Sequence, residues 1–114
     1  MENKNKDIIR ELIKYIIKIK RYCNNVDYAS FVTNEQLHEA CVFNLFQIGE
    51  SANRLNDDFT RHYSEISWSE IRGLRNRIAH DYQGIHIEII WDIIQNDLEP
   101  LQEQLLLIES QLTK

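Results

Sequence analysis

Apolar side chains recur every three or four positions along most of this chain, which is the spacing that buries one face of an α-helix. The first such stretch runs from about Asp7 to Cys23 and predicts an amphipathic helix. Ile17 falls on the charged side of this helix, so we expect Ile17 to lie outside the core. The other apolar residues form the predicted core face: Ile8, Ile9, Leu12, Ile13, Ile16, Ile19 and Tyr22.

A second helix is predicted from about Asn34 to Leu55, after a connector that covers residues 24–31. Thr33 or Asn34 can cap its first turn, because both side chains accept hydrogen bonds from free backbone amides. Gly49 interrupts this helix and costs about 1 kcal/mol relative to alanine. A close helix crossing at Gly49 would explain that cost. The predicted core face is Leu37, Cys41, Leu45, Ile48 and Ala52.

The polar segment 56–67 predicts an irregular region with one helical turn near residues 58–62. Ser67 is the expected N-cap of a third helix, and Glu70 is its capping-box partner. This helix is expected to run from Trp68 to about His80 or Asp81.

Gly84 is expected to end the third helix, and a last helix is predicted from near Ile85. Pro100 should bend or restart this last helix, because proline lacks an amide hydrogen and its ring clashes with the preceding turn. Its apolar stripe continues almost to the C-terminus: Ile87, Ile90, Trp91, Ile94, Leu98, Leu101, Leu105, Ile108 and Leu112.

These elements predict an all-α fold, an antiparallel bundle of four to five helices in a single domain over residues 1–114. Several apolar stripes are wider than one small bundle needs, which favours a homodimer formed through helices. A self-sufficient monomer remains the alternative.

Composition narrows the class of protein. The formal net charge of −5 argues against a general nucleic-acid coat protein, although it allows a local basic site. Cys23 and Cys41 have no metal-ligand spacing with the histidines, so we expect two buried thiols and no metal or cofactor. Charged residues interrupt the apolar N-terminal stretch, so we expect a cytoplasmic protein that does not bind membranes.

The densest group of chemically active side chains lies on the third predicted helix. It comprises Arg72, Arg75, Asn76, Arg77, His80, Asp81 and Tyr82. Arginine offers a planar, permanently charged fork for phosphate oxygens. Histidine exchanges protons near neutral pH. A solvated basic helix face is the alternative to a functional site here.

Helix geometry separates two of these residues. Arg75 and His80 are five positions apart, which leaves them about 140° apart around an ideal helix. Asn76 and His80 share a face. Arg75 and His80 can converge if the helix ends near His80, if the arginine curls round the helix, or if a second subunit brings its own copy across a two-fold axis.

The motif Arg75-x4-His80-x-Tyr82, with Asn76 after the arginine, resembles the mark of HepT-like toxins of the HEPN superfamily. The likeness covers nearly the whole chain. Supporting features are Ile48-Gly49-Glu50-Ser51 on the second helix, Trp68 with Ile71 before the motif, and Gly84 with Trp91 after it. Ser51 stands where relatives commonly have alanine.

This resemblance implies a HEPN-type helical dimer and metal-independent endonuclease cleavage of RNA. It implies that Arg75 and His80 are catalytic, with Asn76, Arg72 and Arg77 binding phosphate or RNA.

The resemblance also implies a toxin of a type VII HepT/MntA-like toxin–antitoxin system. Its expected partner is an MntA-type nucleotidyltransferase that adenylylates Tyr82 and so blocks the site.

Glu50 is expected to support the basic cluster as an ion-pair partner, and Trp68 and Trp91 as core or interface anchors. One alternative is a non-catalytic module that holds a nucleotide or substrate for a nucleotidyltransferase. Another is a purely structural helical dimer. The complete Arg-x4-His-x-Tyr set favours the nuclease.

Overall fold

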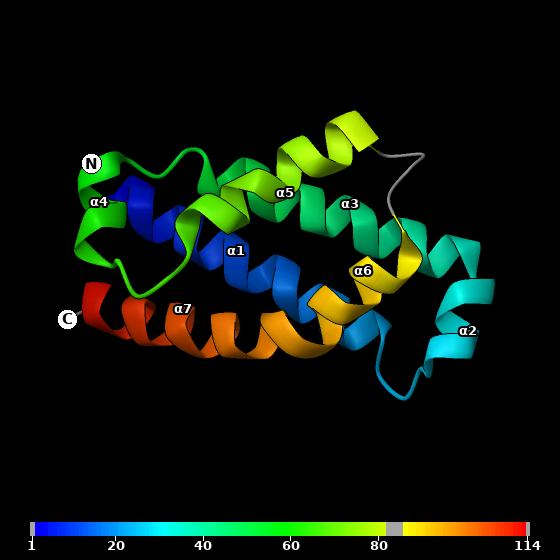
Figure 1. Ribbon diagram of the computed structural model, residues 1–114. Coiled ribbons are helices and arrows are strands. Elements are labelled where there is room, and N and C mark those ends of the chain that lie inside the picture. The colour runs from blue at the N-terminus through cyan, green and yellow to red at the C-terminus, as the bar shows by residue number, and fades with distance from the viewer. Residues whose placement is uncertain (1, 82–85, 114) are drawn as a thin grey trace.

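The computed structural model describes residues 2–81 and 86–113, with side chains described for residues 4–78 and 86–113. All regular elements in these ranges are helical, which confirms the predicted all-α class (Figure 1). In chain order they are α1 (Glu2–Tyr22), α2 (Tyr28–Thr33), α3 (Glu35–Ala52), α4 (Asp57–His62), α5 (Trp68–Asp81), α6 (Ile87–Asp92), the π-helical segment η1 (Ile93–Asp97) and α7 (Leu98–Leu112).

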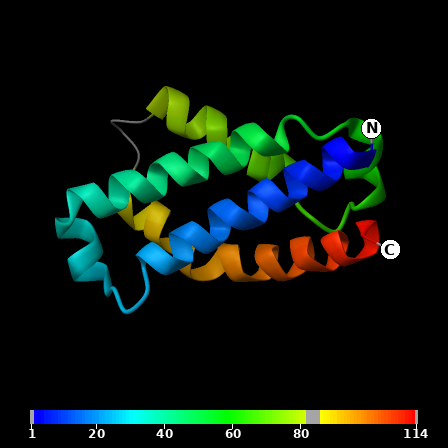
Figure 2. The same ribbon diagram turned by 180° about the vertical axis from the view of Figure 1, so that it is seen from behind.

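Helix α1 runs antiparallel to both α3 and α7 and lies between them (Figure 2). Three polar contacts join α1 to α7, one of them from the Lys20 Nζ to a Glu99 carboxylate oxygen over 3.3 Å. The Arg10 Nε donates to a Glu109 carboxylate oxygen over 2.9 Å, and the Lys20 Nζ donates to the Gln102 side-chain oxygen over 2.7 Å. Helix α5 packs on α3, so α3 is the layer that separates α5 from α1.

The core follows the predicted stripe of the first helix. Ile9, Ile16 and Ile19 of α1 are fully buried, whereas Ile17 is 44% exposed, as its position in the pattern predicts. Cys41 and Leu45 of α3 are also fully buried. The three- and four-residue spacing therefore identified most of the buried faces of α1 and α3. The prediction is wrong for Tyr22, which is 39% exposed at the last position of α1.

The prediction of a connector over residues 24–31 is wrong for its last four residues, because α2 begins at Tyr28. The Asp27 carboxylate caps this short helix by accepting from the Ser30 amide over 2.8 Å. Phe31 is fully buried and packs its ring against Trp91, with ring centroids 4.9 Å apart. Burial of Phe31, rather than helix length, holds this element.

The predicted N-cap at Asn34 is confirmed, since its side-chain oxygen accepts from the Leu37 amide over 3.0 Å. The helix predicted to reach Leu55 ends at Ala52. Pro100 lies within α7, and the irregularity expected of it falls one turn earlier, in η1. Asn96, whose carbonyl would accept from residue 100 in a regular α-helix, belongs to η1.

The two cysteines are buried free thiols, as predicted. Their sulfur atoms lie 3.6 Å apart and share a hydrogen bond that joins Cys23, directly after α1, to Cys41 in the second turn of α3. That hydrogen bond and burial both raise the pKa of Cys41, so this group stays a neutral thiol. None of the helices in the described part of the chain is long and apolar enough to cross a membrane.

Candidate active site

The closest approach of two helices in the site is between Gly49 of α3 and Arg75 of α5. A Cβ atom built on Gly49 would lie 2.6 Å from the Arg75 amide nitrogen and 3.0 Å from the Arg75 Cβ. Only glycine fits such a contact, which is the close crossing that the sequence suggested. The crossing places the Arg75 side chain directly beside the next residue of α3, Glu50.

Two hydrogen bonds orient the Arg75 guanidinium. Its Nε donates to a Glu50 carboxylate oxygen over 2.9 Å, and its Nη1 donates to the Asn76 side-chain oxygen over 3.2 Å. The Arg75 and Glu50 side chains remain 41% and 45% exposed, so the pair is reachable from solvent. The ion pair expected between Glu50 and the basic cluster is therefore confirmed, and it leaves outer N–H groups of Arg75 for a ligand.

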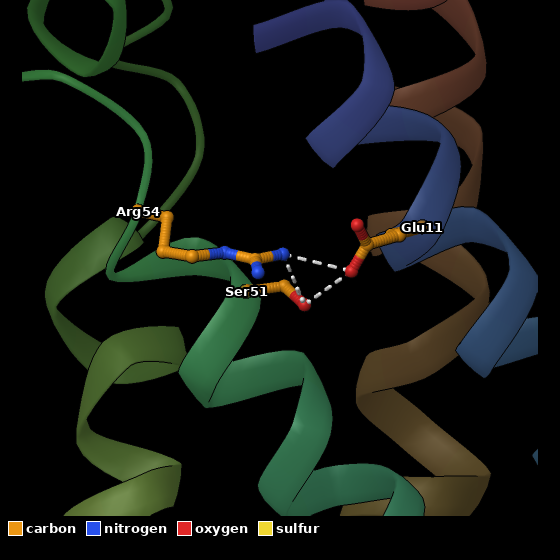
Figure 3. A network of polar contacts seen from close by, with 3 residues as sticks. All are labelled: Glu11, Ser51 and Arg54. Carbon is orange, nitrogen blue, oxygen red and sulfur yellow. Dashed lines mark hydrogen bonds and ion pairs between the residues drawn. The ribbon is translucent and has the colours of Figure 1, made fainter. Parts of the chain in front are cut away.

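Ser51, which follows Glu50 in α3, contacts α1 on the side of α3 away from α5. The Ser51 hydroxyl donates to a Glu11 carboxylate oxygen over 3.0 Å, and the Arg54 Nη2 donates to the same oxygen over 2.8 Å (Figure 3). Helix α3 is thus tied to α1 through Ser51 and to α5 through Glu50. This double attachment fixes the carboxylate on which the orientation of Arg75 depends.

His80 lies on the last turn of α5, where the structure describes the backbone but not the side chain. Helix α5 continues to Asp81, so Asn76 and His80 are four residues apart on one continuous helix and share a face. The bond from Arg75 to Asn76 draws the guanidinium round α5 towards that face. Tyr82 lies outside the described residues.

Arg72 occupies a different environment from Arg75. Its Nε donates to the Ala52 carbonyl over 3.3 Å, and its Nη2 donates to the Leu55 carbonyl over 3.1 Å. These carbonyls lie at and just beyond the C-terminus of α3, where backbone acceptors lack helical partners and a positive charge is favourable. Arg72 therefore joins α5 to the end of α3.

Arg77 lies on yet another side of α5. Two positions separate it from Arg75, which turns it about 160° around the helix. It is exposed and lines a cavity between α5, η1 and α7. The four predicted phosphate-binding or catalytic residues with described side chains therefore divide into three groups: Arg75 with Asn76, Arg72 alone, and Arg77 alone.

Acidic, histidine and cysteine side chains are the usual metal ligands in proteins. Among the side chains that the structure describes, no three or more of them are grouped so as to hold a metal ion. The groups that can act on a ligand in this part of the molecule are the guanidinium, amide and carboxylate of Arg75, Asn76 and Glu50.

Residues 12–108 match the family model described as ribonuclease HepT-like. The chain belongs to the HepT-like ribonuclease family. It is similar to a "Putative RNase" of Caldanaerobacter subterraneus, which is 33% identical over 69% of this chain and 70% of that protein. It is also similar to a "Putative RNase" of Methanocaldococcus jannaschii, 26% identical over 87% of this chain and 91% of that protein. No solved structure matches the chain at a significant level.

A HepT-like protein named "Probable ribonuclease HepT" in Thermococcus cleftensis is 24% identical over 90% of this chain and 93% of its own length. The family model begins within α1 and ends within α7, so it includes all the residues grouped around Arg75. The HepT-like assignment therefore applies to the part of the fold that carries the candidate site.

The sequence did not single out Phe43, which is 59% exposed on α3. Helices α3 and α5 run in opposite directions, since Arg72 contacts Leu55 and Arg75 contacts Glu50 (Figure 1). Phe43, six residues before Gly49, therefore lies towards the His80 end of α5. The available signal was its place in the pattern, since Phe43 is off the core face that Cys41 and Leu45 define. A large apolar residue on a polar helix face marks a surface that can be covered.

Proposed function

We propose that this chain is an RNA endonuclease that needs no metal ion, with Arg75 and His80 as its catalytic residues. The observation that carries the proposal is the restraint on Arg75. Glu50 holds its Nε, and its Nη1 reaches Asn76, which shares a helix face with His80. This arrangement supports a guanidinium that is held in place to meet a phosphate, to which a second copy of the chain brings its own His80.

In the proposed reaction, the 2′-hydroxyl of a ribose attacks the adjacent phosphorus. The bond from phosphorus to the 5′-oxygen then breaks, which leaves a 2′,3′-cyclic phosphate. His80 takes the proton of the attacking hydroxyl or gives one to the leaving oxygen, and water exchanges the other proton. Arg75 binds the scissile phosphate and stabilises the negative charge that develops on it.

The neighbouring polar residues have supporting roles in this proposal. Glu50 positions Arg75, and Asn76 orients the phosphate or His80. Arg77 is exposed and binds RNA next to the scissile phosphate. Two bonds already hold Arg72 at the end of α3, so Arg72 contributes to RNA binding through the placement of α5.

The proposed active form is a homodimer in which two copies of the motif form one cleft. The separation of about 140° between Arg75 and His80 on one helix favours a site completed by a second chain. Phe43 is 59% exposed towards the His80 end of α5, and the partner copy would cover it.

A mixture of two inactive proteins tests the dimer. Arg75→Ala chains and His80→Ala chains, mixed, unfolded together and refolded, should regain cleavage, because a mixed dimer combines one intact arginine with one intact histidine. Mixed dimers without activity would contradict a site shared between chains.

Sedimentation should also show that Phe43→Ser weakens the dimer while the helical circular dichroism is kept.

The proposed biological role is a toxin of a HepT/MntA-like toxin–antitoxin pair. A partner nucleotidyltransferase transfers AMP from ATP to the Tyr82 hydroxyl, with release of pyrophosphate. The added bulk and negative charge, two residues from His80, would repel an RNA phosphate. Mass spectrometry after incubation with the partner and ATP should find AMP on Tyr82 and none on a Tyr82→Phe protein. An unmodified Tyr82 would contradict this form of control.

Purified protein and a growth assay test the ribonuclease proposal. Arg75→Ala should lower RNA cleavage by about 100-fold or more and relieve growth arrest. Arg61→Ala is a matched control, because it also removes one exposed arginine, but from α4. Equal losses in the two variants would mean that overall charge, rather than a site, supports RNA binding. Nucleotide binding without any RNA cleavage would favour the non-catalytic alternative.

A further inference from the structure

A cavity of about 390 Å³ lies between α5, η1 and the first turn of α7. Its volume is within the range of roughly 300–1,000 Å³ that is common for small-ligand pockets. Much of its wall is apolar, with contributions from Ile48, Ile71, Leu74, Ile93, Leu98 and Leu101. Such a wall suits a flat ring that carries polar groups only at its edge.

Four charged residues line the cavity: Glu65, Glu70, Arg77 and Asp97. Glu70 and Arg77 lie on the same side of α5, because seven residues are nearly two full turns, and they are about 10 Å apart along the helix axis. Asp97 of η1 lies close enough to Glu70 for their charges to interact. Burial, followed by the carboxylates of Asp92 and Glu70, raises the pKa of Asp97. The cavity thus has acceptors at the Glu70 end and a cation one helical turn from His80.

This distribution of charge fits a single bound nucleotide, with its phosphate at the cation and the edge of its base at the carboxylates. Arg77 follows Glu70 towards the C-terminus of α5 and lies three residues before His80, so Arg77 and His80 are neighbours on the helix surface. A phosphate bound by Arg77 would therefore lie next to the scissile phosphate. The attached base would extend along α5 between the apolar walls and bring its edge to Glu70 and Asp97.

The base can be named from the chemistry of those two side chains. An ionised carboxylate only accepts hydrogen bonds. The Watson–Crick edge of guanine presents two adjacent donors, the N1–H and the 2-amino group. Adenine, cytosine and uracil each place at least one acceptor beside their donor, and a carboxylate would repel that acceptor.

We propose that this cavity binds the guanine of the nucleotide adjoining the scissile phosphate, with Glu70 and Asp97 on the base edge and Arg77 on the phosphate. The proposal rests on the proposed ribonuclease function and adds base selection to it. It predicts cleavage beside guanosine in single-stranded RNA, because a paired base would not be free to enter the cavity.

Binding of guanosine monophosphate to the purified full chain, followed by calorimetry, tests the pocket separately from catalysis. It should bind at least about tenfold more tightly than the adenosine, cytidine or uridine monophosphates. Glu70→Gln and Asp97→Asn should each weaken this binding by about tenfold. Glu103→Gln is the matched control, since Glu103 is exposed on α7 and does not line the cavity. Circular dichroism checks that each variant is folded.

Cleavage of single-stranded RNA provides the second measurement. Replacing each guanosine by inosine, which lacks the 2-amino group, should lower cleavage at those positions by wild type but change little with Glu70→Gln. Equal binding of all four nucleotides, no binding at all, or binding that folded Glu70→Gln retains would overturn the pocket. Selective guanosine monophosphate binding without RNA cleavage would support the pocket and contradict the ribonuclease. Cleavage at all bases without selective binding of guanosine monophosphate would support the ribonuclease and contradict the pocket.

Discussion

Gly49 and Arg75 are in backbone contact across the α3–α5 crossing, and a Cβ atom on Gly49 would lie 2.6 Å from the Arg75 amide nitrogen. The obstacle to that Cβ is backbone, which cannot rotate away as a side-chain tip can. Because Glu50 follows Gly49 directly, the same crossing sets the distance between the Glu50 carboxylate and the Arg75 guanidinium. Helix packing and site geometry are therefore coupled at this glycine.

Gly49→Ala should lower the free energy of unfolding by about 1–3 kcal/mol, because the added methyl group overpacks the crossing. This loss is expected even though alanine is the better helix former by about 1 kcal/mol. The shift of α5 should also separate Arg75 from Glu50 and reduce RNA cleavage. Urea unfolding and a cleavage assay on the same sample measure both effects.

Gly73→Ala is the matched control for that substitution. Gly73 also lies inside a helix, but apart from the adjoining residues and backbone of α5 itself, nothing in the described structure is within 4 Å of a Cβ placed there. We expect an increase of about 1 kcal/mol in the free energy of unfolding at the same protein concentration. A similar stabilisation by Gly49→Ala would contradict the tight crossing.

Arg72→Ala should mainly lower the stability of the fold, whereas Arg77→Ala should mainly lower RNA cleavage. Loss of Arg72 removes two charged hydrogen bonds to carbonyls at the end of α3, so the free energy of unfolding should fall by about 1–2 kcal/mol. Loss of the exposed Arg77 should change it by less than about 0.5 kcal/mol but weaken RNA cleavage. Assays corrected for the folded fraction distinguish the two, and equal losses of cleavage per folded molecule would contradict the division of roles.

Glu50→Ala should lower cleavage several-fold while changing the free energy of unfolding by less than about 1 kcal/mol, because the ion pair with Arg75 is half exposed. Glu50→Gln should retain more activity than Glu50→Ala, since its amide oxygen can still accept from the Arg75 Nε. The two variants are compared by kcat and KM. Equal activity in both would show that orientation of Arg75 by an acceptor at position 50 does not matter.

Asp97→Asn should stabilise the fold at neutral pH. Burial and the carboxylates of Asp92 and Glu70 raise the pKa of Asp97, so the folded state disfavours its ionised form. The stabilisation by protonated Asp97 is complete below the unfolded pKa and is lost as pH rises through the folded pKa. The Tm advantage of Asp97→Asn should therefore shrink as pH falls towards about 4. A constant Tm difference between the two pH values would contradict this explanation.

The sequence predicted the long helices because their buried faces repeat over many turns, as in α1, where Ile16 is buried and Ile17 is exposed. It missed α2, because six residues are too few for such a repeat. The only local signal was Asp27, whose carboxylate caps the amide of Ser30. A short helix that depends on the burial of Phe31 can be recognised only when its tertiary partner is known.

The sequence also placed Arg75, Asn76 and His80 on one helix and suggested Glu50 as a partner. It could not separate Arg72 from Arg77. The spacing gives the direction in which each side chain leaves α5, but it does not tell which other helix of the bundle packs on that side. The carbonyl partners of Arg72 come from the end of α3, and the cavity beside Arg77 comes from η1 and α7, so only the assembled bundle distinguishes these arginines.

The most direct test of the central claim compares wild type with His80→Ala on single-stranded RNA in the presence of EDTA, with the product ends identified. Wild type should cleave without metal and leave 2′,3′-cyclic phosphate or its hydrolysed form. His80→Ala should retain the helical circular dichroism but lose cleavage by about 100-fold or more. Equal cleavage by the two proteins, or wild-type cleavage that EDTA abolishes, would contradict the proposed mechanism.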